Sequence, residues 1–219
     1  MSLKPILYST PMVKAIAADL KTATRRLKGL EEINQDPDQW QPDTAAFQFN
    51  IYGKLTLCFE NLKSHELKHI NLPYGPIGGQ LYIRESFLIL EPEHCHNGFK
   101  SRFVYKADCE AESEEIRLEY IKAGYPYKWK PSIHMPKEAA RYFLNVVNIT
   151  AERLKSITEA QAEEEGIRAI EPGIYKDYTG KLNYVHTAKE SFFTLWEKIN
   201  GKASLDLNPW VWVYNFIKK

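Results

Sequence analysis

The sequence is poor in cysteine and almost neutral, and both shortages exclude classes of protein. Its three cysteines, Cys58, Cys95 and Cys109, are odd in number and show no paired spacing, so we expect reduced thiols in a cytoplasm rather than a disulfide framework. Lysine and arginine number 29 against 28 aspartate and glutamate, which gives a formal net charge of +1. A chain with so little net charge has no global attraction for nucleic acid, so any basic site must be local.

Long apolar runs are also missing. No stretch is long enough to cross a bilayer, and Lys4 is followed by only a few apolar residues before Ser9, which does not match a secretory signal. We therefore predict a cytoplasmic protein without a membrane partner. The length of 219 residues predicts one domain, with enough chain to bury a real core.

Periodicity and capping signals predict a mixed α+β chain with mainly antiparallel strands. Strands are expected at residues 6–8, 47–51, 55–59, 80–90, 101–106, 141–149 and 210–217. A first helix is expected at about residues 11–20. Two more helices are expected to begin at capping boxes, at 158–161 and 187–190, and to end at Gly166 and Gly201. Residues 31–43 and 110–115 are polar and are expected to be loops. Residues 176–185 are expected to form a loop or a small hairpin.

The stretch from Lys21 to Arg26 gathers polar groups where the helical period stops. On a strand, Thr22, Thr24 and Arg26 share one face and Arg25 lies on the other. Such a cluster is suited to a phosphate, a nucleobase edge or an amide. The alternative is a solvated helix end, where a lysine is favoured by the helix dipole.

Lys21-Thr22-Ala23-Thr24-Arg25-Arg26 resembles the Lys-Thr-x-Thr-x-Arg core of the ASCH domain, a member of the PUA-like β-barrel superfamily. The chain looks most like ASCH-related proteins of phages and prophages. One departure is that Asp19-Leu20 stands where the family usually has Gly-Arg, so we expect a different local loop, because aspartate tolerates a left-handed helix end less well. Further matching segments follow in order at 74–85, 129–136, 163–167 and 208–213.

The resemblance implies a fold and a function. The fold is a single PUA-like β-barrel domain over residues 1–219, with flanking helices and insertions near 30–70, 90–130 and 168–186. The function is binding of RNA or a modified nucleoside in a cleft of the barrel, without a cofactor. One alternative is an amidohydrolase acting on N-acylated cytidine or a similar small amide. A second is a phage-associated accessory protein that acts through protein contacts.

The resemblance also assigns residues. Some small ASCH proteins hydrolyse N-acylated cytidine, and their catalytic lysine, threonine and glutamate fall on Lys21, Thr24 and Glu165. A lysine beside a carboxylate can have its pKa tuned for proton transfer, and a hydroxyl can bond a developing oxyanion. The alternative role of the pair is a structural ion pair. Residues expected to bind the ligand are Thr22, Arg25, Arg26, Arg84, Trp129 and His134. Any RNA binding would rest on a few cations and show a shallow salt dependence.

Two other patterns favour structural roles. Residues 65–69 match H-E-x-x-H, a zinc motif that needs a helix, but Pro73 follows closely and no third ligand is evident. The histidines around Cys95 are too tightly spaced for a tetrahedral site, so no metal is predicted. Trp210 and Trp212 share one face of a strand and favour core packing, whereas Trp129 and His134 lie in a proline-broken loop where function and packing are equally expected.

Overall fold

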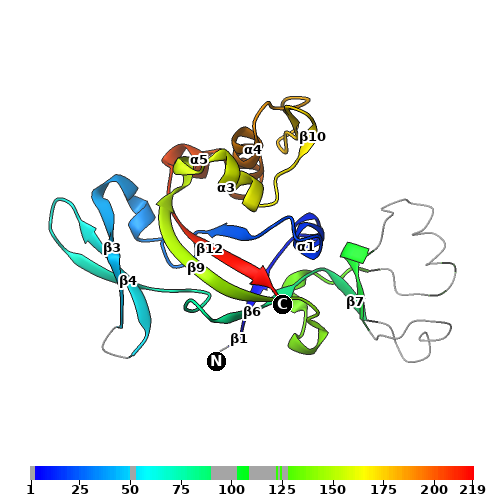
Figure 1. Ribbon diagram of the computed structural model, residues 1–219, viewed down its shortest axis with the longest axis horizontal. Coiled ribbons are helices and arrows are strands. Elements are labelled where there is room, and N and C mark those ends of the chain that lie inside the picture. The colour runs from blue at the N-terminus through cyan, green and yellow to red at the C-terminus, as the bar shows by residue number, and fades with distance from the viewer. Residues whose placement is uncertain (1–2, 50–52, 90–102, 109–121, 123, 125–127) are drawn as a thin grey trace.

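The computed structural model describes residues 3–49, 53–89, 103–108, 122, 124 and 128–219. Its centre is a five-stranded sheet in the order β1-β6-β9-β12-β2 (Figure 1). The pair β1–β6 is parallel and the other three pairs are antiparallel. The predicted mixed α+β class with mainly antiparallel strands is therefore confirmed. The strands of this sheet are β1 (Leu3–Leu7), β2 (Ala23–Arg26), β6 (Gln80–Arg84), β9 (Phe143–Arg153) and β12 (Trp210–Lys218).

Smaller sheets flank the central one. A three-stranded sheet, β3-β4-β5, and a two-stranded one, β7-β8, lie at opposite ends of the molecule in Figure 1, and β10 pairs with β11 near the helices. Their bounds are β3 (Trp40–Phe49), β4 (Leu55–Asn61), β5 (Leu67–Asn71), β7 (Phe87–Ile89), β8 (Phe103–Tyr105), β10 (Ala169–Glu171) and β11 (Ile174–Tyr175).

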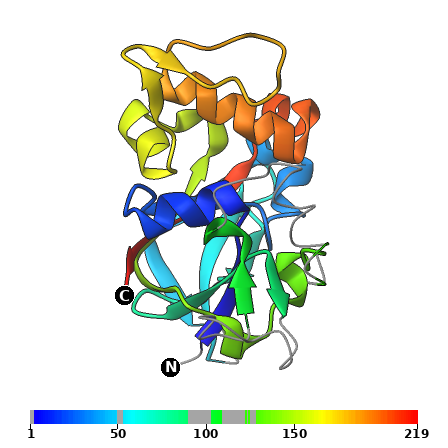
Figure 2. The same ribbon diagram turned by 90° about the vertical axis from the view of Figure 1, so that its right-hand side faces the viewer.

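Helices α3, α4 and α5 contribute to one apolar core of the central sheet, and α1 contributes to the other. Figure 2 shows α3, α4 and α5 above α1. Both predicted capping boxes are present, at Thr158 and Thr187. Among the described residues, no helix is long and apolar enough to cross a membrane. The α-helices are α1 (Thr10–Ala17), α3 (Glu159–Glu164), α4 (Ala188–Asn200) and α5 (Lys202–Leu207), and 3₁₀ turns occupy 33–35, 37–39, 106–108, 132–134, 137–139 and 154–156.

Strand β12 separates two apolar cores. Trp212, Tyr214 and Phe216 belong to the core shared with β1, β6 and α1, whereas Val211 and Val213 belong to the core beneath α3 and α4. This alternation follows from the period of two in a strand. The predicted packing role of Trp212 is confirmed, because its side chain is fully buried in the first core.

Several predicted element boundaries are wrong for tertiary reasons. The single strand 80–90 divides after Arg84, where the buried carboxylate of Glu85 forms a bidentate ion pair with Arg141 at 2.8 and 3.0 Å. The segment 31–43 contains 3₁₀ turns and the start of β3 rather than only loop. The predicted loop at 176–185 is confirmed, and a small hairpin that was not predicted precedes it at 169–175. Strand β5 and helix α5 were not predicted, and the acidic run 110–115 lies outside the described residues.

The zinc-motif segment is not helical. Leu67 opens β5, and His65 precedes it with φ at 57°. The ring of His65 pairs with Glu60 at 2.8 Å, and that of His69 lies 3.5 Å from the hydroxyl of Thr56. A strand does not place two histidines four residues apart on one helical face, as the motif requires.

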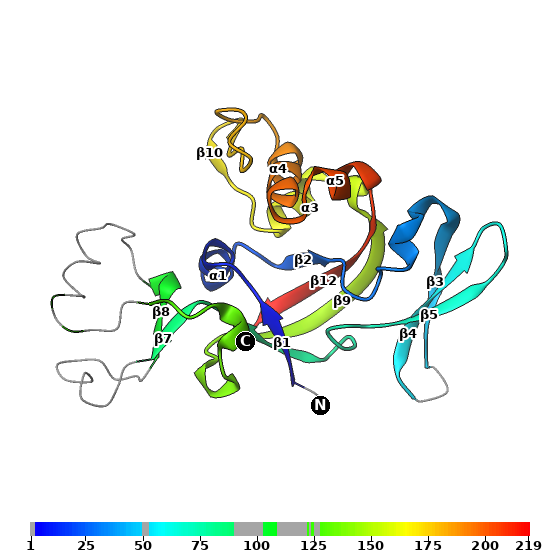
Figure 3. The ribbon, with the colours of Figure 1, turned by 180° about the vertical axis from the view of Figure 1, so that it is seen from behind.

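The two edge strands of the central sheet approach each other. Strands β1 and β2 are its outer members, and α1 connects them (Figure 3). At their ends, the Arg26 guanidinium on β2 donates a hydrogen bond to the Leu7 carbonyl of β1 at 2.8 Å. Within the described residues the sheet is not closed by a backbone ladder, and this side-chain bond spans the seam instead.

Helix α1 ends in a Schellman motif whose left-handed residue is an aspartate. The Leu20 N–H donates to the Ala15 carbonyl at 2.8 Å, and the Asp19 N–H donates to that of Ile16 at 3.0 Å. Asp19 has φ at 57°, and its carboxylate lies 2.9 Å from Lys218 Nζ. The aspartate therefore takes the conformation that glycine favours, and the left-handed helix end is kept.

We predict that Asp19→Gly raises the free energy of unfolding by about 0.5 kcal/mol. Relief of the left-handed strain, about 1 kcal/mol for a residue with a Cβ, exceeds the loss of an exposed ion pair, whose worth is about 0–1 kcal/mol. The control is Ala17→Gly within α1, expected to lose about 1 kcal/mol. Urea denaturation measures both variants. An equal loss in the two would show that the aspartate carboxylate outweighs the strain.

Candidate active site

The segment after α1 is held against the end of α3. The Thr22 N–H donates to the Glu164 carbonyl at 2.8 Å, and the Arg168 guanidinium donates to the Leu20 carbonyl at 2.7 Å. The Arg168 guanidinium also donates to the Glu163 carbonyl at 2.8 Å. The contacts to Glu163 and Glu164 fall on carbonyls at the end of α3, where a helix leaves carbonyls without intrahelical partners and its dipole favours a cation.

Helix α3 ends in a second Schellman motif, built on Gly166. The Gly166 N–H donates to the Glu163 carbonyl at 2.8 Å, and the φ angle of Gly166 is 93°. A Cβ at this position would lie 3.2 Å from Lys21 Cβ and 3.3 Å from Ala15 Cβ. The missing side chain of Gly166 therefore makes room for the stem of Lys21 to pass into the interior.

The result is a buried ion pair between Lys21 and Glu165. Lys21 Nζ lies 2.6 Å from Glu165 Oε2 and donates a second hydrogen bond, of 2.8 Å, to the Glu165 carbonyl. The two side chains are only 2% and 7% exposed. Removing one member of such a pair leaves an uncompensated buried charge, at a cost of about 3–5 kcal/mol.

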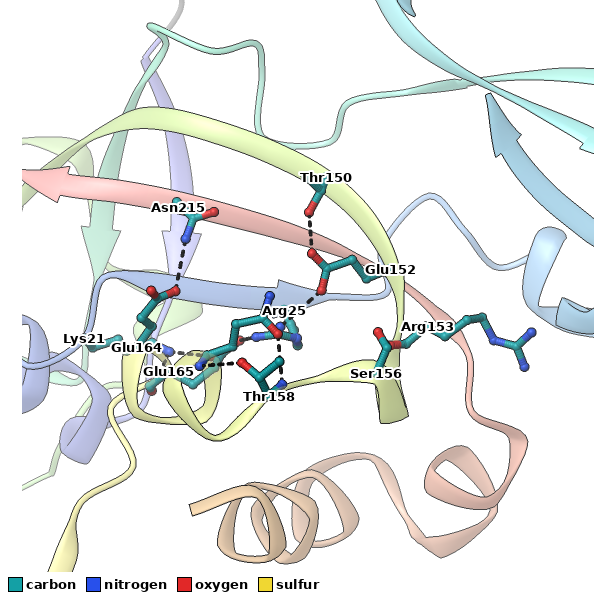
Figure 4. A network of polar contacts seen from close by, with 11 residues as sticks. Lys21, Arg25, Thr150, Glu152, Arg153, Ser156, Thr158, Glu164, Glu165 and Asn215 are labelled. Atoms are coloured by element: carbon teal, nitrogen blue, oxygen red, sulfur yellow. Dashed lines mark hydrogen bonds and ion pairs between the residues drawn. The ribbon is translucent and has the colours of Figure 1, made fainter. Parts of the chain in front are cut away.

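Arg25 holds the other oxygen of the same carboxylate. Its guanidinium lies 3.3 Å from Glu165 Oε1 and 3.3 Å from Glu152 Oε2, and Thr150 donates to Glu152 at 2.9 Å. Figure 4 shows this chain of contacts running from Lys21 across to β9. Both oxygens of Glu165 are thus fixed by cations, and its carboxylate has little freedom to turn.

Burial shifts the pKa of two groups beside this pair. Desolvation lowers the pKa of Lys21, and the neighbouring Glu165 carboxylate opposes that fall. Desolvation also raises the pKa of Tyr8 to about 12. Thr24 and Arg26 face the Tyr8 hydroxyl and oppose this rise, although neither meets hydrogen-bond geometry to it. Lys21 therefore reaches its neutral form more easily than an exposed lysine, while Tyr8 stays protonated.

The ion pair lies in the wall of a cavity of about 460 Å³ between α1, β2 and α4. This volume is within the range of small-molecule sites. Its polar lining includes Lys21, Thr24 and Glu165. Its apolar lining includes one stripe of α4, formed by Phe192, Leu195, Trp196 and Ile199.

The structure brings together five of the residues singled out in the sequence. Lys21, Thr24, Arg25, Arg26 and Glu165 all line the cavity, so the expected convergence of the lysine, threonine and glutamate is confirmed. Their chemical roles stay a prediction. Arg25 lines the cavity with its guanidinium committed to two carboxylates, so it positions Glu165 instead of presenting a free charge.

Four other predicted ligand-binding residues do not line this cavity. The side chain of Thr22 is exposed. Arg84 donates to the carbonyls of Met135 and Ile133 and so fixes the loop beyond β7. His134 is exposed within the 3₁₀ turn at 132–134, and Trp129 is half-buried.

Sequence reasoning missed Tyr8, Tyr74 and the stripe on α4 as cavity residues. The stripe at 192, 195, 196 and 199 has helical spacing, which indicates a buried face but not what that face contacts. Tyr8 directly precedes the helix start at Ser9, and this adjacency was its only signal.

We predict that Gly166→Ala lowers the free energy of unfolding by about 2–3 kcal/mol, because the new Cβ is strained at positive φ and also contacts Lys21. The matched control is Gly173→Ala, where φ is 73° and nothing lies within 4 Å of the added Cβ. We expect that control to lose about 1 kcal/mol from strain alone. Thermal or urea unfolding measures the difference. Equal losses of unfolding free energy in the two variants would mean that the close packing of Gly166 against Lys21 does not add to the cost of the substitution.

Comparisons of the chain with protein-family models, with curated proteins and with solved structures give no match. The function is therefore inferred from the geometry of the cavity and from the resemblance of its motifs.

Proposed function

We propose that this chain hydrolyses the amide bond of a nucleoside-sized substrate, with an N-acylated cytidine as the model compound. The observation that carries the proposal is the 2.6 Å contact between Lys21 Nζ and Glu165 in the wall of a cavity that Thr24 also lines. A lysine of lowered pKa beside a fixed carboxylate is the arrangement that general acid–base chemistry needs.

The hydrogen bonds of Lys21 suit its neutral form. A neutral amine has two N–H groups and one lone pair, and Glu165 supplies two acceptors for those hydrogens, its carbonyl and its Oε2. The lone pair then remains available to accept a proton. Once Lys21 is protonated, Glu165 stabilises the ammonium that forms.

The proposed reaction follows from these roles. Neutral Lys21 takes a proton from a water molecule, whose oxygen attacks the carbonyl carbon of the amide. The Thr24 hydroxyl donates a hydrogen bond to the carbonyl oxygen as it gains negative charge. The carbon–nitrogen bond then breaks, and Lys21 returns the proton to the leaving nitrogen. The products are a carboxylic acid and the free amino compound, and Lys21 is neutral again.

A PUA-like barrel is part of the same proposal. Its support is the mainly antiparallel sheet, the approach of β1 and β2 through Arg26 and Leu7, and the order of the resembling motifs along the chain. The left-handed conformation of Asp19 removes one objection, since this chain reaches the helix end that the family's glycine favours.

RNA binding has less support from the site. Of the four cations near the cavity, Lys21 and Arg25 are buried and paired with carboxylates. Only Arg26 and Lys28 remain for phosphates, so binding of a long chain would be weak. The small-amide reaction uses the buried pair directly, and for that reason we favour it.

We predict that purified protein releases cytidine from N4-acetylcytidine. Lys21→Ala and Glu165→Ala each abolish turnover, because the first removes the base and the second removes the carboxylate that stabilises the ammonium formed by proton transfer. Thr24→Ala slows it by about 10²-fold, because water partly replaces one hydrogen bond to the oxyanion. Chromatography of the products measures the rate.

The control for this assay is Lys14→Gln on the exposed side of α1, which should keep the wild-type rate. Circular dichroism confirms that each variant is folded. Release of cytidine no faster than in buffer, by folded wild-type protein, would refute the reaction on this substrate.

A further inference from the structure

Two cations of the cavity have no acidic partner among the described residues. Arg26 is held by the Leu7 carbonyl and lies over the Tyr8 ring, with 5.0 Å between the guanidinium carbon and the ring centroid. Lys28 is exposed, and its Nζ lies 6.0 Å from the centroid of Tyr74. All four residues line the cavity.

The charges in and beside the cavity do not balance. Glu165 and Glu152 match two of the four cations, Lys21 and Arg25. Arg26 and Lys28 therefore leave about two positive charges at the end of the cavity near β1 and β2. A phosphate monoester carries about −1.5 to −2 at neutral pH, which is the charge that this end would neutralise.

The N-terminus of α1 reaches the same end. Ser9 is its N-cap and makes no side-chain capping bond, and the first turn has no acidic residue. Ser9 and Met12 both line the cavity. Pro11 has no N–H, and the remaining free N–H groups and the dipole at this helix start favour an anion.

Tyr8 is an independent sign of a ligand in the cavity. It is only 5% exposed, and its hydroxyl makes no hydrogen bond within the part of the chain that the structure describes. A buried hydroxyl without a partner costs about 1–3 kcal/mol. An acceptor oxygen brought into the cavity would supply the missing partner.

We propose that Arg26, Lys28 and the start of α1 bind a phosphate group of the substrate, so that the preferred substrate is a nucleotide rather than a neutral nucleoside. This inference rests on the proposed function, whose ion pair lines the same cavity. The phosphate has two possible sources, the terminal group of a free nucleotide and the backbone of an RNA chain. We assign it to the free nucleotide, because only two of the cations that line the cavity are without an acidic partner among the described residues.

The first experiment compares kcat/KM for N4-acetylcytidine and for its 5′-monophosphate. We expect the nucleotide to be preferred by about tenfold or more, since a charge-assisted contact contributes that much. Lys28→Gln should remove most of this preference, and Lys14→Gln on the outer face of α1 should keep it. Equal values for the two substrates in the wild type would overturn the inference while leaving the hydrolase intact.

A second experiment separates failure of the inference from failure of the reaction. Calorimetry measures binding of cytidine, cytidine 5′-monophosphate and a short cytidine oligoribonucleotide without any chemical step. Tighter binding of the monophosphate than of cytidine, weakened by Lys28→Gln and by added salt, supports the phosphate site even if no amide is cleaved. Binding of the oligonucleotide without binding of the monophosphate would overturn the assignment to a free nucleotide, and equal binding of cytidine and the monophosphate would overturn the phosphate site.

Discussion

The buried ion pair between Lys21 and Glu165 is the constraint on which the rest of the site depends. Its members are 144 residues apart in sequence. Glu165 directly follows α3, and Lys21 follows the Schellman motif that ends α1. Two Schellman motifs therefore have to meet, and the absence of a side chain at Gly166 lets them do so. Because an unpaired charge at this depth would cost several kcal/mol, the pair fixes how α1 and α3 sit against each other.

The same region is where the central sheet stays open. Strands β1 and β2 are its edges, and Arg26 joins them by one side-chain bond in place of a ladder. Because β1 and β2 are not paired with each other, the space between these edges can border a cavity. Backbone would occupy that space if the two strands formed a ladder. Arg26 and Leu7 line the cavity, and α4 supplies apolar residues to the same lining. The fold thus places a buried ion pair and an apolar helix stripe around one cavity.

Local signals in the sequence predicted what depends on neighbours in the chain. The capping boxes at Thr158 and Thr187 set helix starts correctly, because the bonds they make span only three residues. Contacts between residues far apart in the sequence could not be predicted from local signals. The end of the strand after Arg84 depends on the ion pair that Glu85 forms with Arg141. Likewise, the Arg25 guanidinium is not free for a ligand because it pairs with Glu152 and Glu165. Convergence of Lys21 with Glu165 was expected from the resemblance, not from periodicity.

The central claim is that Lys21 is a buried lysine whose base form is made accessible at this site. The most direct test is NMR titration of the Lys21 side chain, assigned by comparison with Lys21→Arg. The midpoint should lie below the usual lysine value of 10.5, because desolvation outweighs the attraction of Glu165. In Glu165→Gln it should fall further, since the opposing carboxylate charge is gone. A midpoint at or above 10.5, or one that Glu165→Gln leaves unchanged, would contradict the account.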